Sequence, residues 1–149
     1  MTRKVFAYLT RIQEGEPQLL VFRKVKSPQE GLQVPGGTVE FDEREEEALY
    51  RQIEEESGLV HLRFLSKLDE HVLYRGSRSN SEKRFFFHVE SLEQPPHRWL
   101  HTVDSYSHDD GELLEYFWIP LCKATGMLAR EQDRSLHTLA GYGRRRQAG

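Results

Sequence analysis

The sequence predicts an α/β fold built as one domain, and three observations support this. Stretches rich in β-branched and aromatic residues recur along the chain between turn signals. One acidic segment has the spacing of apolar residues that is typical of an amphipathic helix. The chain has 149 residues, of which 37% are apolar, and this suits a single domain with a hydrophobic core.

The strand pattern begins near the N-terminus. Residues 4–12 are rich in Val, Phe, Tyr and Ile, and a Gly-Glu-Pro turn signal at residues 15–17 separates them from a second apolar stretch. These two stretches are therefore expected to pair as a hairpin. A third, short strand is expected to stop at Pro35-Gly36-Gly37. The predicted strands are residues 4–12, 19–22, 32–34, 62–73 (one or two strands), 84–89 and 113–121.

The clearest predicted helix covers residues 43–57. This segment contains no Gly or Pro, and Leu49, Tyr50 and Ile53 form its apolar stripe. Gly58 follows it and can adopt the left-handed conformation that ends a helix. Residues 128–139 form a second helix candidate.

Composition and charge exclude several classes of protein. The net charge of −3 provides no basic field for nucleic acid, so no nucleic-acid partner is expected. Cys122 is the only cysteine, which rules out an internal disulfide and favours a reducing compartment. No apolar run approaches the roughly 18–20 residues that span a bilayer, and the N-terminus lacks the apolar stretch of a signal peptide. We therefore expect a cytoplasmic protein without a membrane partner.

The acidic helix carries side chains suited to bind a divalent cation. Residues 52, 55 and 56 fall within an arc of about 100° on one face. Glu55 and Glu56 repel each other there, and a cation would relieve the repulsion. Mg²⁺ prefers such oxygen ligands, together with water and phosphate. Arg51 could hold Glu55 or Glu43 in a bidentate pair and so orient the ligands. A solvated acidic surface helix is the alternative, and the residues alone leave both interpretations open.

The segment 37–59 resembles the Nudix box, Gly-x5-Glu-x7-Arg-Glu-U-x-Glu-Glu-x-Gly-U, in which U is a bulky aliphatic residue. Eight of its nine defined positions match at the correct spacing, and only Gln52 departs, where the family has Glu. The flanking strand pattern and the later Trp-Ile-Pro-Leu also resemble Nudix domains. The matching residues are Gly37, Glu43, Arg51, Ile53, Glu55, Glu56, Gly58 and Leu59.

The resemblance implies the Nudix α/β/α sandwich, with a mixed β-sheet between helices, over residues 1–140. Residues 141–149 would form a flexible C-terminal tail. The family hydrolyses a nucleoside diphosphate linked to another group X, so a nucleotide-type substrate and Mg²⁺ or Mn²⁺ as cofactor are implied. A homodimer is compatible with the resemblance, because many members dimerise. The loops at residues 76–83 and 102–111 would select X.

Site residues are carried over by position in the box. The resemblance implies Glu55 and Glu56 as metal ligands with the Gly36 carbonyl as a third, and Glu43 and Arg51 as residues that orient them. The metal would neutralise the pyrophosphate and activate a water molecule, with Arg51 and Glu55 in the catalytic set.

A later loop often supplies a further acidic ligand or base in this family. Glu112, six residues before Trp118, has the expected position. Asp109, Asp110 and Glu115 are alternative candidates for this ligand or base.

Gln52 is the departure that matters for catalysis, because an amide cannot accept a proton near neutral pH. Three explanations remain open. The base comes from a later loop, or the protein is a weak enzyme or nucleotide-binding module, or the residue is an engineered substitution. We favour the first.

Several other residues are candidates for binding substrate. Arg23 follows a predicted strand and could reach a phosphate, and Tyr74 lies where some dinucleoside polyphosphate hydrolases carry a Tyr. Phe85, Phe86 and Phe87 cannot all face one core on a pleated strand, so one is expected to face a cleft and stack on a base. His97 and His101 have i,i+4 spacing but lack further zinc ligands, which favours a structural interpretation. Three arginines at residues 144–146 are more typical of a solvated tail.

Overall fold

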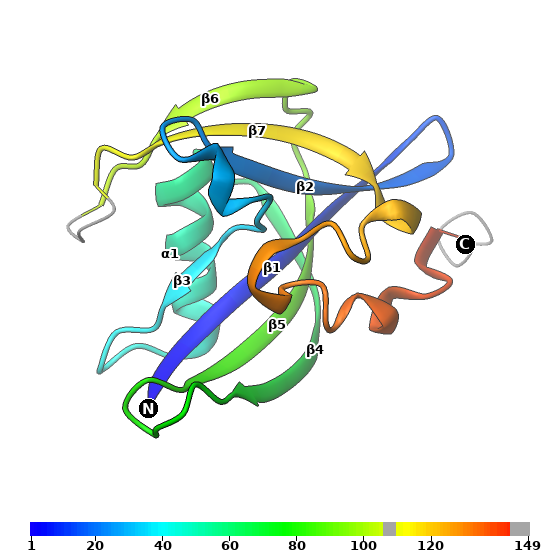
Figure 1. Cartoon of the computed structure of the whole chain (residues 1–149). Helices are drawn as coiled ribbons and strands as arrows, with labels where there is room; N and C mark the ends of the chain where they lie inside the picture. The colour runs from blue at the N-terminus through cyan, green and yellow to red at the C-terminus, as the bar shows by residue number, and fades with distance from the viewer. Residues whose placement is uncertain (106–109, 144–149) are drawn as a thin grey trace.

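The computed structural model describes residues 1–105 and 110–143 (Figure 1). Within these residues, seven strands form one mixed sheet, and six of them follow the order β4-β5-β1-β2-β7-β6. The central pair β1–β5 is parallel, whereas the other pairs are antiparallel. The bounds are β1 Thr2–Gln13, β2 Glu16–Lys24, β3 Gly36–Thr38, α1 Glu45–Ser57, β4 Leu62–Leu73, β5 Glu82–Ser91, β6 Arg98–Thr102 and β7 Leu113–Pro120.

The central strand β1 has two different partners along the same edge. Its first half pairs with β3, from Lys4 opposite Thr38, and its end pairs with β2 through a hairpin that begins at Thr10. Strands β2 and β3 therefore diverge along this edge of β1, and we call the space between them the fork. An isolated β-bridge between Phe22 and Gln33 connects β2 to the segment that precedes β3. This fork positions the functional site described below.

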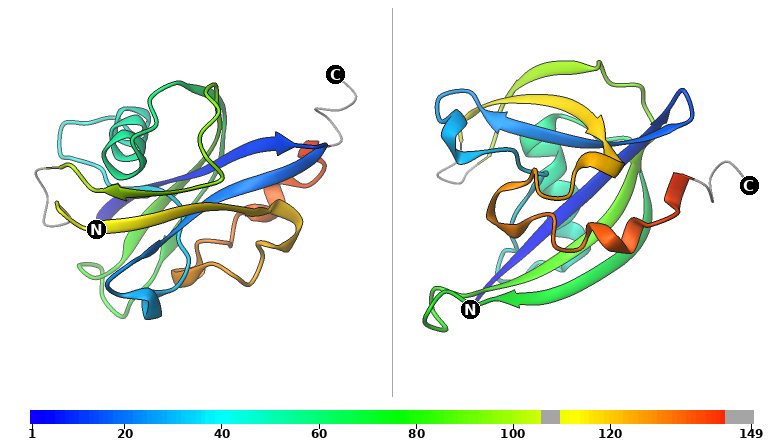
Figure 2. Two further views of the ribbon diagram at one scale, coloured as in Figure 1. Left: turned by 90° about the horizontal axis from the view of Figure 1, so that it is seen from above. Right: turned by 45° about the vertical axis from the view of Figure 1, so that its right-hand side comes forward.

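Both faces of the sheet are covered. The helix α1 covers one face, and the segment after β7 covers the other (Figure 2). Phe85 and Phe87 point into the core beside α1, and Phe86 points into the opposite core. All three are at most 3% exposed. The expectation that one of them faces a cleft is therefore wrong, because alternating side chains meet a core on each side.

The second predicted helix, residues 128–139, is absent. The segment instead forms two 3-10 turns, η3 at Ala129–Glu131 and η4 at Leu136–Leu139. Arg130 and Glu131 have φ values of 54° and 57°, which interrupt a right-handed helix. The turns nevertheless bury Leu136 and Leu139 against the sheet, so the second face is covered by irregular backbone.

Two strand predictions near the site also change. Residues 32–34 make only isolated bridges, and the third strand is β3, which includes Gly36 and Gly37. Strand β6 was not predicted. Residues 62–73 form one strand with two register shifts, and the hairpin β1–β2 is confirmed.

The acidic helix is confirmed, with a start at Glu45. It buries Ala48, Leu49 and Ile53 against the sheet, whereas Tyr50, which was predicted to belong to the apolar stripe, is 36% exposed and lies outside the buried face. Gly58 ends the helix with φ of 82° and donates its N–H to the carbonyl of Glu54.

Among residues 1–105 and 110–143, no helix combines the length and apolarity required to cross a membrane. The proposed tail is described only as far as residue 143, so the arginines at residues 144–146 lie outside the described residues.

Candidate functional site

Strand β3 lies between β1 and the helix α1, and two glycines permit this close approach. A Cβ atom on Gly36 would overlap the backbone carbonyl oxygen of Val5, and one on Gly37 would overlap the side-chain amide of Gln52. A larger residue at position 36 would push the strand away from β1, whereas one at position 37 would displace the Gln52 side chain. The Gly-Gly pair therefore brings the strand backbone within reach of the acidic side chains on α1.

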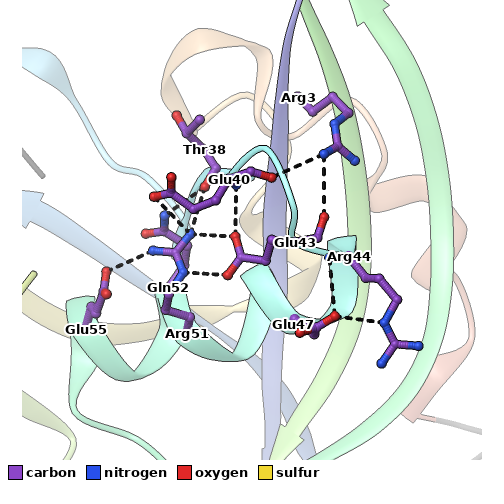
Figure 3. A network of polar contacts seen from close by, with 9 residues as sticks. All are labelled: Arg3, Thr38, Glu40, Glu43, Arg44, Glu47, Arg51, Gln52 and Glu55. Atoms are coloured by element: carbon purple, nitrogen blue, oxygen red, sulfur yellow. Dashed lines mark hydrogen bonds and ion pairs between the residues drawn. The ribbon is translucent and has the colours of Figure 1, made fainter. Parts of the chain in front are cut away.

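Arg51 connects the start of the box to its acidic end (Figure 3). Its Nε and Nη2 donate to the two carboxylate oxygens of Glu43, at 2.7 and 2.9 Å. Its Nη1 donates to Glu55 at 3.2 Å, and Nη2 also donates to the carbonyl of Thr38 at 3.0 Å. The hydrogen bond from Arg51 lowers the pKa of Glu43 below its usual value. The structure thus joins Arg51, Glu43 and Glu55 in one network.

Glu56 reaches the strand from the same helix. Its Oε1 accepts a hydrogen bond from the backbone N–H of Gly36 at 2.8 Å. In an antiparallel ladder the N–H and the carbonyl of one residue point to the same side. The Gly36 carbonyl therefore points away from β1, on the side where Glu56 lies.

Glu55 is the carboxylate whose ionisation is least favourable in this network. Burial raises its pKa above the usual value, and the opposing charge of Arg51 only partly offsets the effect. A cation close to Glu55 would remove this penalty.

Gln52 acts as a hydrogen-bond donor. Its Nε2 donates to the carbonyl of Thr38 at 3.2 Å, beside the bond from Arg51 (Figure 3). A glutamate could not make this contact, because an ionised carboxylate only accepts. The residue that departs from the family pattern therefore helps to attach α1 to β3.

A cleft of about 460 Å³ lies in the fork between β2 and β3. Its wall contains Gly36, which directly precedes the box, Glu56 from the box, and Glu112 from the segment before β7. Glu55 instead borders a neighbouring hollow on the outer side of the box, together with Arg51. Two larger hollows lie elsewhere on the described surface and contain none of the box residues.

Basic side chains outnumber acidic ones in the described wall of the cleft. The Lys24 Nζ lies 3.7 Å from Glu112, and the Arg84 guanidinium donates to Glu82 at 3.0 Å. An excess of positive charge beside carboxylates suits a phosphate group that binds together with a cation. The charged residues of the wall are Lys4, Lys24, Arg75, Arg84, Arg130, Glu56, Glu82 and Glu112.

The sequence reasoning missed the basic residues of this wall. They lie on β1, β2, β5 and the loops after β4 and β7, far apart in the sequence. No motif or spacing connects them, and only the order of strands in the sheet brings them together.

The other predicted substrate residues lie outside the cleft. Arg23 pairs with Glu115 at 2.6 Å, and Glu115 also pairs with Arg98 at 3.2 Å. Tyr74 is 71% exposed, and its hydroxyl donates to the Gly76 carbonyl.

The acidic alternatives to Glu112 and the two histidines with i,i+4 spacing lie in separate surroundings. Asp110 accepts a hydrogen bond from the Ser105 N–H, and Asp109 lies outside the described residues. His97 contacts the Arg11 side chain, whereas His101 contacts the Glu55 carbonyl. The two histidines therefore have separate structural partners.

The donor atoms of the site fit a hard divalent cation. Carboxylates of Glu55, Glu56 and Glu112 and the Gly36 carbonyl offer oxygen only, as Mg²⁺ prefers. Within the described part of the chain, no three Asp, Glu, His or Cys side chains are already grouped as a metal site. Glu55 and Glu56 would therefore exchange contacts with Arg51 and Gly36 for a cation.

Comparison with known proteins identifies the domain. A family model described as NUDIX domain matches residues 1–140. No curated protein matches the sequence. Among solved structures, an Ap4A hydrolase of C. elegans has a TM-score of 0.67 at 16% identity, over 95% of this chain and 98% of that chain.

Two further solved structures show the same fold. The NUDIX domain of Shewanella oneidensis NrtR, complexed with ADP ribose, has a TM-score of 0.66 at 15% identity, over 99% of this chain and 88% of that chain. A MutT NUDIX hydrolase from Burkholderia pseudomallei has a TM-score of 0.64 at 18% identity, over 94% of this chain and 100% of that chain. At these identities the likeness establishes the fold.

Proposed function

The chain belongs to the Nudix hydrolase superfamily, and from this premise we propose that it hydrolyses a phosphoanhydride bond in a nucleoside diphosphate linked to another group. Mg²⁺ or Mn²⁺ is the proposed cofactor. The observation that supports this most directly is the cleft in the fork of the sheet. This cleft combines Glu56 of the box and the preceding Gly36 with Glu112 and with basic side chains able to bind phosphate.

Each group in the cleft has a proposed role. Glu56 and the Gly36 carbonyl would hold the cation, with Glu55 as a further ligand once it leaves Arg51, while Glu112 would lie beside the cation without binding it tightly. A bound divalent cation would neutralise the pyrophosphate and lower the pKa of an attacking water molecule. Lys24 and neighbouring basic side chains orient the phosphates.

Arg51 acts through other residues. It holds Glu43 and Glu55 by hydrogen bonds of 2.7 to 3.2 Å, and so limits the positions that the Glu55 carboxylate can adopt. Its role is to position a ligand rather than to touch the substrate.

The proton of the attacking water requires an acceptor other than Gln52. We assign this role to Glu112, because it lies in the wall of the cleft that contains Glu56. Its rival Glu115 is held by two arginines outside the cleft, and Asp110 caps a backbone N–H. The same glutamate cannot be both a tightly bound ligand and a base, so Glu112 would approach the cation only weakly.

A second candidate function is a nucleotide-binding module with little turnover. The hydrogen bond from Gln52 to Thr38 favours it, since this residue has a structural contact and no capacity to accept a proton.

Release of phosphate-containing products from a panel of nucleoside diphosphate derivatives, with Mg²⁺ or Mn²⁺, tests the proposal. Glu56→Gln should lower kcat/KM by more than about 100-fold, because even residues that support ligands are worth about 10–100-fold. Glu54→Gln is the matched control, since Glu54 is exposed on the same helix and is outside the cleft. If the protein binds nucleotides but turns over none of the substrates, the hydrolase proposal fails and the nucleotide-binding module is the function that remains.

A further inference from the structure

The C-terminal end of the helix α1 carries a concentration of negative charge. Glu54, Glu55 and Glu56 follow one another in its last turn, and the helix has no basic residue in this turn. The carbonyl groups at a helix C-terminus add a partial negative charge, so carboxylates are unfavourable there. The last four carbonyls of a helix also lack partners within it. Donors from another part of the chain are therefore needed to fix the position of this turn.

The strand β6 and the residue that follows Val103 provide these donors. The Nε2 atom of His101 lies 2.9 Å from the carbonyl oxygen of Glu55, and the Trp99 side chain donates to the Ser57 carbonyl at 3.2 Å. A carbonyl oxygen only accepts, so Nε2 of His101 must carry the proton. The backbone N–H of Asp104 donates to the same Glu55 carbonyl at 3.2 Å. Two donors therefore converge on the backbone of Glu55.

Gly58 leaves the space in which the imidazole ring packs. A Cβ atom at this position would lie 3.3 Å from the Cε1 and Nδ1 atoms of His101, which is closer than most side-chain contacts. The glycine that ends the helix with a positive φ thus also permits His101 to approach the helix end.

The segment that contains Val103 connects this helix end to Glu112. The N–H of Val103 donates to the Glu112 carbonyl at 2.8 Å, and the Val103 carbonyl accepts from the N–H of Gly111 at 2.9 Å. Val103 also lines the cleft together with Glu56 and Glu112. One short segment is therefore bonded both to the acidic end of α1 and to the backbone of the residue proposed as the base.

The geometry of the proposed site depends on this connection. Glu55 and Glu56 project from the helix, whereas Glu112 lies in the segment before β7, so the two sets of carboxylates share no local backbone. A displacement of about 1 Å can lower the rate of an enzyme about 100-fold, even when its cause is far from the reacting atoms. A side chain that fixes the helix end against β6 would therefore affect the chemistry without touching the substrate.

We propose that His101 is a positioning residue, which holds the backbone of Glu55 against the segment leading to Glu112 and so sets the metal ligands of α1 relative to the base. The hydrogen bond from its Nε2 atom is the interaction responsible. The inference rests on the proposed function of the cleft, and it adds a residue that lies outside both the box and the wall of the cleft.

Binding of Mn²⁺ to the full chain, followed by electron paramagnetic resonance of the free ion, tests this inference without any turnover. His101→Met removes the donor and keeps a side chain of similar length. It should weaken Mn²⁺ binding about tenfold, the lower end of the range for residues that support metal ligands. His101→Gln retains an N–H at a similar distance from the backbone and should recover most of the affinity.

His97→Met is the matched control for the loss of a histidine. His97 contacts the Arg11 side chain and borders a hollow that contains none of the box residues, so its substitution should leave Mn²⁺ affinity unchanged. Circular dichroism checks that each variant is folded.

A measurement on the unmodified chain does not depend on any variant. Addition of Mg²⁺ should shift the ring-nitrogen resonances of His101 and leave those of His97 unchanged, because only His101 contacts a residue proposed to bind the cation. In turnover assays at saturating Mg²⁺, His101→Met should lower kcat about tenfold with little change in KM, since the contact orients the ligands and the base rather than the nucleotide.

The outcomes distinguish the two proposals. Unchanged Mn²⁺ affinity in His101→Met, an equal loss in His97→Met or His101→Gln, or unshifted His101 resonances would each overturn the role of His101 while the proposed hydrolysis stands. If the Mn²⁺ results are as expected but no nucleotide is hydrolysed, the proposed hydrolysis fails and the role of His101 towards the metal ligands stands. Failure of the unmodified chain to bind Mn²⁺ overturns both.

Discussion

Gln52→Glu restores the family residue at the one departure from the box, and the structure predicts that it destabilises the metal-free protein. The substitution removes the hydrogen bond from Nε2 to the Thr38 carbonyl, 3.2 Å long, which is worth about 0.5–1.5 kcal/mol. It also places a third carboxylate three and four residues before Glu55 and Glu56, at about 0.2–0.5 kcal/mol for each like-charge pair. We therefore expect a loss of about 1–2.5 kcal/mol.

Urea unfolding with and without Mg²⁺ measures this change. With a slope of about 2 kcal/mol per molar urea, the midpoint should fall by about 0.5–1.2 M without metal. Mg²⁺ should stabilise Gln52→Glu more than the unmodified chain, because the folded state gains an oxygen ligand. Gln52→Met is the matched control, since it removes the hydrogen bond without adding charge. An unchanged midpoint in the absence of metal would refute the assigned role of Gln52.

The same variant tests the assignment of the base. If Glu112 accepts the proton, Gln52→Glu should change kcat by less than about tenfold, whereas Glu112→Gln should lower it by about 10²–10⁴-fold. A rise of more than about 100-fold in Gln52→Glu would mean that position 52 is where the missing base belongs.

The remaining predictions concern residues that hold the site in place or stabilise the core beneath it. Arg51→Ala should cost about 1–3 kcal/mol in unfolding free energy at neutral pH. Because Arg51 holds the pKa of Glu43 below 4.5, the ionised carboxylate stabilises the fold above that value, and this stabilisation is lost as pH falls through the lower folded pKa. The effect of Arg51→Ala should therefore shrink in urea titrations as the pH is lowered progressively below 4.5. Gly36→Ala should lower stability by about 1–3 kcal/mol and reduce turnover, because its Cβ would overlap the Val5 carbonyl. Phe86→Ala should cost about 3–5 kcal/mol in thermal or urea unfolding, since Phe86 is fully buried.

Contrary results would each correct a specific point. A pH-independent effect of Arg51→Ala would exclude Glu43 as its main partner. Retained stability and turnover in Gly36→Ala would show that β3 can move away from β1. A small effect of Phe86→Ala would contradict the second core beneath the segment after β7.

Much of the helix could be predicted from local sequence. The absence of Gly and Pro, the buried positions Leu49 and Ile53, and the cap at Gly58 depend on interactions within a few residues. The exposed Tyr50 shows the limit of this reasoning, because the width of the buried stripe depends on the surface against which the helix packs.

The segments that depend on distant partners were predicted less well. The helix predicted for residues 128–139 follows its apolar spacing, yet the chain turns twice there to fit Leu136 and Leu139 against the sheet. The three phenylalanines from Phe85 to Phe87 were correctly expected to face in two directions. Whether the second direction was a cleft or another core depended on the segment after β7, which is distant in the sequence.

The sequence by itself determined the family, the acidic helix and the identity of the donor atoms, because the box is a contiguous pattern and its chemistry belongs to its residue types. Only the tertiary structure decided which groups meet. The divergence of β2 and β3 from β1 forms the cleft and brings Glu112 to the side of Glu56. Packing of β6 against the end of α1 also joins His101 to the Glu55 backbone, a contact that no spacing in the sequence indicates. The reason is physical: strand order and close approach at the two glycines depend on packing between distant segments, which residue types in one stretch do not specify.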